Sequence, residues 1–518
     1  MILNDPHGGP APPGLGGRST LDELFCKAAL RRPGDTALID PPNRESFTDG
    51  APRRLTYAQA DRMISAIAGR LRRIGLNTDA IVGLQIANSV ENVLTLLAVL
   101  RAGLIAMPLP LLWWRAEAIA ALGRVGAHAL IVSGRVGMVD HFDLAMQVGA
   151  EIFSIRHVCG FGRNPPDGLI PLDDLYAAAE LDPLPSAERE RALPPGPGAH
   201  LAAITWDVTP DGLVPVARSH AELIAGGVAI LREGRLEQDA VVLSTLTMSS
   251  FAGLAVALIP WLLSGGTLAL HHPFDPETFL AQRRSIRCDT VVVPGPLVAE
   301  LAEAGQLSAA DGLKRVFGVW RAPERLPRAP TWRDDTVALT DVQVFGETGL
   351  IAAGRGPGGR PGTILFGPVT APRGASGAMI VAEVQPSGKG TVALRGPMAP
   401  RCPFPPGAER AALPHLKIDA NGFVDTGYGC RSEDSPAMTV TGPPPGVVSV
   451  GGYRFVARDL QDMVRGVEGD ASLAALPDAL AGHRLAGNAP DRDSVQAALT
   501  KLGANPLLIG AFRDRTAA

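Results

Sequence analysis

Two patterns of apolar positions alternate along the first 133 residues of this chain. Residues 55–76 carry Met63, Ile67 and Leu71 at the spacing of an amphipathic helix, which ends at Gly75. By the same criteria, further helices are predicted at 20–32, 88–103 and 116–126, and short apolar strands at 80–86, 104–109 and 128–133. Strands that alternate with helices in this way predict an α/β fold with a mostly parallel sheet.

The pattern changes twice further along the chain. Alternation resumes from about 201 to 305, and from 354 onward glycine and proline become dense and short strands dominate, which predicts a small β lobe. The stretch TGPPPG at 441–446 is typical of a linker, and we predict that its three prolines form a stiff, extended spacer. The predicted organisation is a flexible leader at 1–18, a large N-terminal domain at 19–440, a proline-rich hinge at 441–446 and a shortened C-terminal domain at 447–518.

Residues 240–274 contain no Asp, Glu, Lys or Arg and so raise the question of a membrane helix. A spanning helix needs about 20 continuous apolar residues. Pro260 and the Ser-Gly-Gly at 264–266 interrupt this run, and its start is rich in hydroxyls. We therefore predict a buried strand, helix, turn and strand rather than a membrane span.

Composition excludes several classes of function. The chain has 518 residues with a formal net charge of −4, and no basic cluster with interleaved aromatics indicates nucleic-acid binding. Its five cysteines are scattered and form no CxxC pair, which is typical of reduced thiols. The first 17 residues lack the apolar run of a signal peptide. We therefore expect a cytoplasmic protein.

Several stretches, taken in order, resemble the signature motifs of one family. They are LTYAQADRMISAIAGRL with VGLQIANSVENVLTLLAVLRAGLIAMPL, LIPWLLSGGTLALHHPFDPETFL, VFGETG, GTVALRGPMA, VDTGYGCR and VSVGGYRFVARDLQDMV. The order and spacing are similar to those of the adenylate-forming superfamily, particularly its acyl-CoA synthetases, over almost the whole chain. The resemblance implies a large N-terminal domain of two α/β subdomains plus a β lobe, followed by a reduced C-terminal α+β domain.

The resemblance also implies a chemistry in two steps. In the family, a carboxylate and ATP give acyl-AMP and pyrophosphate with Mg²⁺, and a CoA or carrier-protein thiol then takes the acyl group. A catalytic lysine near the C-terminus takes part in the first step. Only Lys501 lies far enough along this chain, but its surroundings do not match the family pattern, and the end of an amphipathic helix at Gly503 explains it as well.

The stretch ITWDVTPDGLVPVARSH at 204–220 departs most from the family. Aligned on its final Ser-His, the family's phosphate loop falls on 206–215. Val208 and Asp211 then replace glycines, Pro210 replaces a threonine and Val214 replaces the lysine. A phosphate loop needs small residues whose N–H groups converge on an anion beside a cation. We predict a loop that has lost this function; an insertion that displaces the real loop is the alternative.

The remaining nucleotide positions are also altered. Gly349 stands where the family has its magnesium-binding glutamate, and Glu347 could reach the metal or serve as a solvated or structural carboxylate. Tyr428 replaces the ribose-binding aspartate, and Asp425 nearby could bind a ribose or cap a loop. Trp320 and Arg321 stand where the adenine side has small residues. The candidate nucleotide-binding residues that the resemblance implies are Thr205, Thr209, Gly212, Phe345, Gly346, Glu347, Thr348, Asp425 and Arg431.

An acyl pocket is predicted on the apolar stretch 241–270, with Ser249, Ser250 and Gly253 as its candidate residues. A well-packed core explains the same stretch equally well. Two hypotheses follow: a carboxylate–thiol ligase with weakened or lost adenylation, or a non-catalytic protein that binds an acyl group, an acyl thioester or a biosynthetic partner protein. A third hypothesis is a structural subunit of a biosynthetic complex, which differs from the second only because it binds no ligand.

Overall fold

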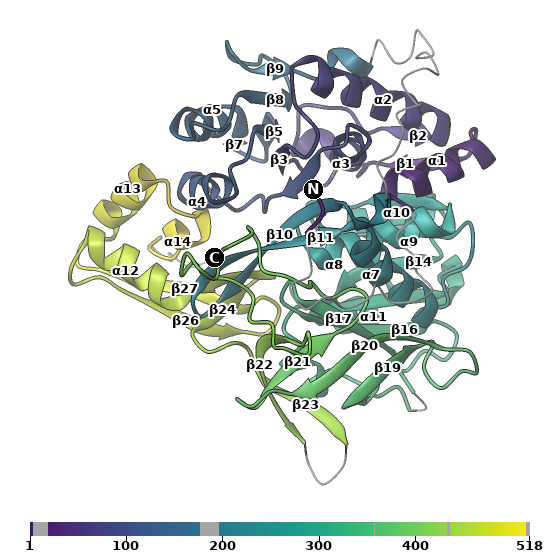
Figure 1. Cartoon of the computed structure of the whole chain (residues 1–518). Helices are drawn as coiled ribbons and strands as arrows, with labels where there is room; N and C mark the ends of the chain where they lie inside the picture. Colours follow the sequence, from purple (N-terminus) through teal and green to yellow (C-terminus); the bar gives the residue numbers. More distant parts are fainter. Residues whose placement is uncertain (4–18, 177–195, 357, 433–435, 514–518) are drawn as a thin grey trace.

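The computed structural model describes residues 1–3, 19–176, 196–356, 358–432 and 436–513. Residues 4–18 of the predicted leader lie outside the described residues. Along the chain follow two α/β layers, a β lobe and a small C-terminal α+β unit (Figure 1). The boundaries predicted for separate domains stay predictions.

The first layer contains a seven-stranded sheet in the order β11-β10-β4-β3-β5-β8-β9. Its strands are β3 (Ile81–Gln85), β4 (Ile105–Pro108), β5 (Ala129–Ser133), β8 (His157–Phe161), β9 (Ile170–Pro171), β10 (Leu201–Thr209) and β11 (Gly212–Ser219). Its helices are α2 (Tyr57–Arg73), α3 (Val90–Arg101), α4 (Arg115–Val125) and α5 (His141–Glu151), and β6 (Arg135–Val136) and β7 (Val139–Asp140) form a separate hairpin. Every residue of β3, β4 and β5 is buried, which explains why these strands are continuously apolar.

The second layer contains an eight-stranded sheet in the order β17-β16-β15-β14-β12-β13-β1-β2, with antiparallel strands only at its two edges. Its strands are β1 (Thr36–Ile39), β2 (Arg54–Thr56), β12 (Val241–Ser244), β13 (Thr267–Leu270), β14 (Thr290–Pro294), β15 (Arg315–Trp320), β16 (Ala338–Phe345) and β17 (Gly349–Gly354). Its helices are α1 (Leu21–Arg31), α7 (His220–Glu233), α8 (Phe251–Gly253), the π-helix η4 (Leu254–Leu258), α9 (Ile259–Ser264), α10 (Pro276–Ser285) and α11 (Gly295–Glu303). The mostly parallel sheets confirm the predicted α/β fold class.

Two smaller sheets complete the fold. The β lobe is an antiparallel sheet of β18 (Ile364–Leu365), β19 (Gly367–Ala371), β20 (Met379–Pro386), β21 (Thr391–Arg395), β22 (Val424–Ser432) and β23 (Ala437–Gly442). The C-terminal unit contains β24 (Val447–Val450), β25 (Tyr453–Val456), β26 (Ser472–Asp478) and β27 (Gly482–Asn488), with α12 (Ala457–Val467), α13 (Arg492–Leu502) and α14 (Pro506–Gly510). This unit has a hydrophobic cluster of its own.

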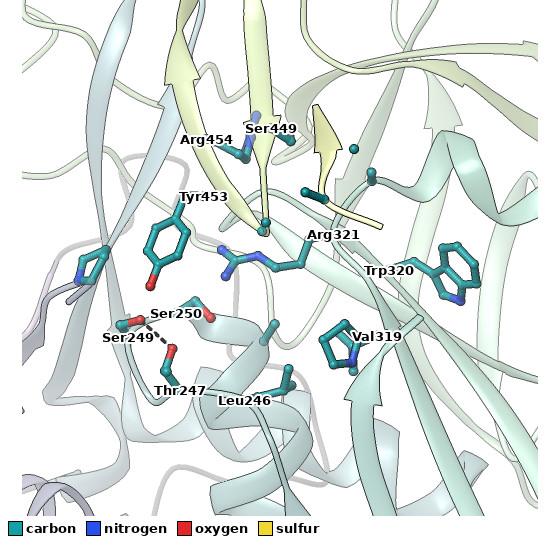
Figure 2. Close-up of a pocket in the computed structure, with 18 of the residues that line it drawn as sticks. Leu246, Thr247, Ser249, Ser250, Val319, Trp320, Arg321, Ser449, Tyr453 and Arg454 are labelled. Atoms are coloured by element: carbon teal, nitrogen blue, oxygen red, sulfur yellow. Dashed lines mark hydrogen bonds between the residues drawn. The ribbon is translucent and has the colours of Figure 1, made fainter. Parts of the chain in front are cut away.

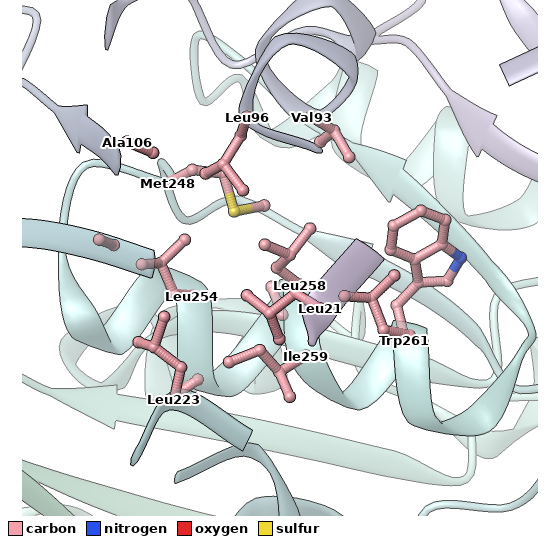
Figure 3. Packing of buried hydrophobic residues seen from close by; sticks show 14 of the residues in the cluster. Leu21, Val93, Leu96, Ala106, Leu223, Met248, Leu254, Leu258, Ile259 and Trp261 are labelled. Carbon is pink, nitrogen blue, oxygen red and sulfur yellow. The ribbon is translucent and has the colours of Figure 1, made fainter. Parts of the chain in front are cut away.

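One large hydrophobic core joins the two α/β layers. Figure 3 shows Leu96 of α3 and Leu21 of α1 packed near Leu258 and Trp261 of the run from α8 to α9. This run sits between β12 and β13, so the strand, helix, turn and strand predicted at 240–274 are confirmed. Among the described residues, no helix combines the length and apolar character needed to cross a membrane.

The proline-rich stretch between β23 and β24 is not the extended spacer that its three prolines predict. The N–H of Val447 donates a hydrogen bond of 3.1 Å to the carbonyl of Pro444, and Gly446 has φ +73°. A proline in the second position and a glycine with positive φ in the third are typical of a type II turn. The prediction of a stiff spacer is therefore wrong, because the Pro-Gly turn signal outweighs the extended preference of the prolines.

Candidate functional site

A cavity of about 410 Å³ lies between the carboxyl ends of the second sheet and the C-terminal unit (Figure 2). Ligands of open α/β sheets bind at this edge. Its walls come from β10 and from the loops that follow β12, β15 and β16, together with the turn between β24 and β25. The lining residues therefore extend from Pro110 to Gly482, and no single stretch of sequence defines the site.

The segment aligned with the phosphate loop is a β-hairpin. β10 and β11 stay paired as far as Thr209 and Gly212, so only Pro210 and Asp211 connect the two strands. The Thr209 hydroxyl accepts the N–H of Asp211 at 3.3 Å and donates to the carbonyl of Gly212 at 3.1 Å. A connection of two residues is too short for a loop whose successive N–H groups surround an anion.

Asp207 of β10 is the charged residue of this hairpin that faces the cavity. Its carboxylate accepts the N–H groups of Val208 at 2.8 Å and Glu347 at 2.9 Å, and it forms an ion pair with Arg454 of β25. The side chains of Asp207 and Arg454 are only 6% and 7% exposed, respectively. The pair joins the first layer to the C-terminal unit across 247 residues of sequence.

Glu347 lies in the turn between β16 and β17 and is buried. One carboxylate oxygen accepts the N–H of Phe251 at 2.6 Å, and the other lies 3.4 Å from Nη2 of Arg321. Burial raises the pKa of Glu347, while the charge of Arg321 lowers it. The structure thus shows a structural carboxylate rather than a solvated one.

These residues do not fit a bound magnesium ion. Both oxygens of Glu347 already contact protein groups, and Gly349, at the family's glutamate position, has no side-chain ligand. Nowhere in the part of the chain that the structure describes do three or more His, Cys, Asp or Glu side chains form a group that could hold a metal ion. Magnesium prefers several oxygen ligands in octahedral geometry.

Arg218 of β11 donates hydrogen bonds to the backbone of the turn that contains Glu347. It donates hydrogen bonds to the carbonyls of Glu347, Thr348 (3.0 Å) and Met398 (3.3 Å), and its guanidinium lies 3.9 Å from the ring centre of Phe251. Burial lowers the pKa of Arg218 to about 10, so it stays charged at neutral pH. No local pattern in the sequence indicates this role for Arg218, since its contacts come from three distant segments.

Aromatic side chains occupy positions that the family resemblance assigns to the adenine side. Phe345 packs edge-on against Tyr428 with ring centres 5.6 Å apart, and both residues are buried. The indole N–H of Trp320 donates to Asp341 at 2.9 Å, and its ring covers Gly295 so closely that a Cβ there would lie 2.3 Å from it. In Figure 2 the indole of Trp320 points away from Tyr453.

Hydroxyl groups and three arginines, Arg321, Arg325 and Arg454, line the cavity. Figure 2 shows the guanidinium of Arg321 beside Tyr453 and near Ser250, with Ser249 and Thr247 below the hydroxyl of Tyr453. The hydroxyls of Thr247 and Ser249 are 2.9 Å apart, and the hydroxyl of Ser250 accepts the N–H of Gly253 at 3.3 Å. Ser249 and Ser250 therefore line the cavity, whereas Gly253 lies in the core, where a Cβ would meet the carbonyl of Thr247.

The other residues singled out in the sequence lie elsewhere. Asp425 accepts the Thr391 hydroxyl at 2.6 Å and the N–H of Gly427 at 3.0 Å, which is a loop-capping role. Arg431 is exposed on β22, and Lys501 is exposed in the last turn of α13. Thr205 and Thr348 are buried beside the cavity, Gly346 lies against Asp207, and Thr209 and Gly212 form the hairpin end. Of the nucleotide candidates, only Glu347 lines the cavity among the described residues.

Comparison with protein families and known proteins finds similarity to AMP-binding enzymes and to ligases of carboxylic acids. Residues 25–184 match the family described as AMP-binding enzyme. The chain is 27% identical over 487 residues to salicyl-AMP ligase / salicyl-S-ArCP synthetase of Mycobacterium tuberculosis, covering 90% of this chain and 80% of that protein. It is 26% identical to salicylyl-CoA synthase / salicylate adenylyltransferase of a Streptomyces species, with 87% and 83% covered. It is also 21% identical to the medium-chain fatty-acid–CoA ligase of Escherichia coli, with 91% and 81% covered.

Solved structures show the same fold. The amide bond synthetase McbA of Marinactinospora thermotolerans superposes with a TM-score of 0.69 at 18% identity, covering 95% of this chain and 94% of that one. MbtA of Mycobacterium smegmatis gives 0.62 at 21% identity, covering 95% and 90%. These matches support the resemblance of this chain to the adenylate-forming superfamily, and the similar proteins include ligases of acyl and aryl acids.

Proposed function

We propose that this protein binds an acyl or aryl carboxylic acid in the 410 Å³ cavity and that its adenylation of the acid is weak or absent. The hairpin at 209–212 carries the proposal, because it replaces the loop that would surround the phosphates of ATP. Activity with ATP and Mg²⁺ is the family norm, so this protein would be an exception within its own family.

Three further features support the loss of adenylation. Asp207 places negative charge where phosphate charge would lie, and Arg454 already neutralises it. Glu347 is held by protein groups on both oxygens. Lys501 is exposed on α13 rather than beside the cavity. Removing one group aimed at a developing charge typically costs about 10²–10³ in rate, so several such losses together leave little activity.

The cavity itself supports retained ligand binding. Its volume is within the range of small-molecule sites, which are mostly apolar with a few well-placed polar groups. Leu246, Leu297 and Phe274 give apolar walls, and the serines give hydroxyls. The relatives' names include salicylate and medium-chain fatty acids, so both classes of acid are candidates. Thioesters of these acids with CoA or a carrier protein are the alternative ligands of a non-catalytic protein.

Acid-dependent exchange of pyrophosphate into ATP tests the proposal. Salicylate, benzoate and medium-chain fatty acids serve as substrates, with the salicyl-AMP ligase of Mycobacterium tuberculosis as the positive control. We expect exchange at least about 10³-fold slower than in the control. Exchange at a rate similar to the control with any of these acids would contradict the loss of adenylation.

A further inference from the structure

Arg321 is the charged side chain in the middle of the cavity. It follows the last residue of β15, and its backbone carbonyl accepts a hydrogen bond of 3.3 Å from the hydroxyl of Tyr428, which fixes the loop. Its guanidinium points toward Tyr453 and lies near Ser250 in Figure 2. Among the described residues, its only side-chain ion pair is the 3.4 Å contact with Glu347.

The charges around Arg321 leave it incompletely neutralised. Asp207 is paired with Arg454, and Arg218 and Arg321 both lie near Glu347. Glu324 interacts with Arg325 and Arg454 at the edge of the same cavity. Arg218 also interacts with the buried carboxyl group of Glu222. Among the described residues, the only ion pair of the Arg321 side chain is the 3.4 Å contact with Glu347, and 33% of that side chain is exposed. Burial raises the pKa of Glu347 and of Glu324.

We propose that Arg321 binds the carboxylate of the acid ligand directly, so that the acid binds without ATP and without a metal ion. This inference rests on the proposed function of the cavity and names the residue that selects its ligand. A partly exposed guanidinium with a single long ion pair, beside apolar walls, fits a monocarboxylate with an apolar body. A guanidinium recognises a carboxylate through two parallel hydrogen bonds, which gives both strength and orientation.

The remaining polar groups suit the same orientation. A carboxylate held by Arg321 would lie close to the hydroxyls of Ser249, Ser250 and Tyr453, which can donate to its remaining lone pairs. The apolar part of the acid would then face Trp206 and Leu246. A neutral analogue of the same shape would lose the ion pair and keep only the apolar contacts.

Calorimetry with matched pairs of ligands tests the proposal on the full chain without nucleotide or metal. Benzoate, salicylate and octanoate are compared with benzamide, salicylamide and octanamide. For at least one pair, we expect the acid to bind about 10- to 100-fold more tightly than the amide. Arg321→Gln should remove this difference by weakening only the acid, and Arg321→Lys should restore part of it.

Arg328→Gln is the matched control, because it removes one positive charge from an exposed position on the same segment. It should leave the affinity for acids unchanged within about twofold, as expected for a screened surface charge. The proposal is overturned by equal affinity for acid and amide in the unmodified protein, by an equal loss of both in Arg321→Gln, or by no binding of any acid. If Arg321→Gln does not fold, the affinities of the unmodified protein for the acid and the amide still test whether the cavity selects a carboxylate.

The outcome is distinguishable from that of the pyrophosphate exchange. Rapid exchange together with Arg321-dependent acid binding would remove the proposed loss of adenylation and leave the role of Arg321 intact. Absent exchange together with equal binding of acid and amide would support the loss of adenylation and remove the proposed role of Arg321.

Discussion

Asp207 connects three parts of the molecule through one carboxylate. It accepts hydrogen bonds from the N–H groups of Glu347 and of Val208, the next residue of its own strand, and it forms an ion pair with Arg454 of the C-terminal unit. Both side chains are almost fully buried, so the loss of either charge leaves the other without its partner. Breaking a buried pair in this way typically costs about 3–5 kcal/mol.

Asp207→Asn should therefore lower the free energy of unfolding by about 3 kcal/mol, measured by denaturant titration. Asp211→Asn is the control on the same hairpin, because Asp211 is exposed and lies 3.7 Å from exposed Lys417. That change should cost less than about 1 kcal/mol. The double variant with Arg454→Met should recover part of the loss. Equal effects of Asp207→Asn and Asp211→Asn would show that the pair with Arg454 adds no stability.

Buried histidines predict a loss of stability in mild acid. Burial lowers the pKa of His220 to about 3, and of His141 and His272 to about 4, from an ordinary value of 6.5. Between these values the unfolded chain binds protons that the folded chain does not. The contribution of these histidines to the free energy of unfolding should be fully present above pH 6.5. It should fall as the pH decreases from 6.5 toward the lowered pKa values, by up to about 1.4 kcal/mol per pH unit for each histidine.

Urea titrations at several pH values measure this slope. His220→Gln should reduce it, since glutamine can still accept the N–H of Leu21 that the Nδ1 atom of His220 accepts at 3.2 Å. His415→Gln serves as the control, because His415 lies in a loop and its Nδ1 atom is 2.7 Å from the carbonyl oxygen of Leu413. A slope unchanged by His220→Gln would contradict the assignment.

At the scale of elements, glycines in α7 allow close packing against the run from η4 to α9. A Cβ on Gly227 would lie 2.2 Å from a methyl group of Ile259, whereas a Cβ on Gly123 of α4 would meet no atom within 4 Å. Gly227→Ala should therefore cost about 1–3 kcal/mol of unfolding free energy through overpacking. Gly123→Ala should stabilise the protein by about 0.5–1 kcal/mol, because alanine is the better helix former. Similar effects for both variants would contradict this difference.

Local signals allowed much of the fold to be predicted from the sequence. The capping box of Thr20 with Glu23 marks the start of α1, and Pro260 with the following glycines marks the run that ends before β13. For the hairpin of β10 and β11, the sequence predicts only a loop that no longer binds phosphate. Its turn signal, Pro-Asp-Gly between apolar stretches, was nevertheless present in the sequence.

The candidate site was much harder to predict than the fold. Asp207 and Arg454 meet across 247 residues, and Arg218 contacts three separate segments. Such pairs leave no periodic or local trace in a single sequence. Family positions identified Glu347 and the serines, because the motif before them fixes their place on the fold, whereas the partners that decide their chemistry come from elsewhere.

At the scale of the whole molecule, contacts at three places hold the C-terminal unit. Besides the pair of Asp207 with Arg454, the side chain of Asn505 donates to the carbonyl of Leu112 at 2.6 Å, and Arg325 donates to the carbonyl of Ala479. Active members of the family rotate this unit between two poses. We expect a single arrangement here, since rotation would break all three contacts and expose the buried pair.

Distances between spin labels at Met138 and Ala497 test this expectation, after Cys26, Cys402 and Cys430 are replaced by serine. Met138 is fully exposed in the first layer, and Ala497 is exposed on α13. One distance population should persist with ATP, with an acyl-adenylate analogue and with CoA. A second population that appears with any of these ligands would contradict the fixed arrangement.

The most direct test of lost adenylation is the affinity for a stable acyl-adenylate mimic. An acid and its acyl-sulfamoyl-adenosine derivative are compared by calorimetry on the same protein. An adenylating enzyme binds a mimic of its reaction intermediate at least about 10²-fold more tightly than the acid, because the nucleotide site contributes. With the hairpin closed and Phe345 packed against Tyr428, the mimic should bind no more tightly than the acid. A gain of about 10²-fold or more would show that the nucleotide site is intact and would contradict the proposed function.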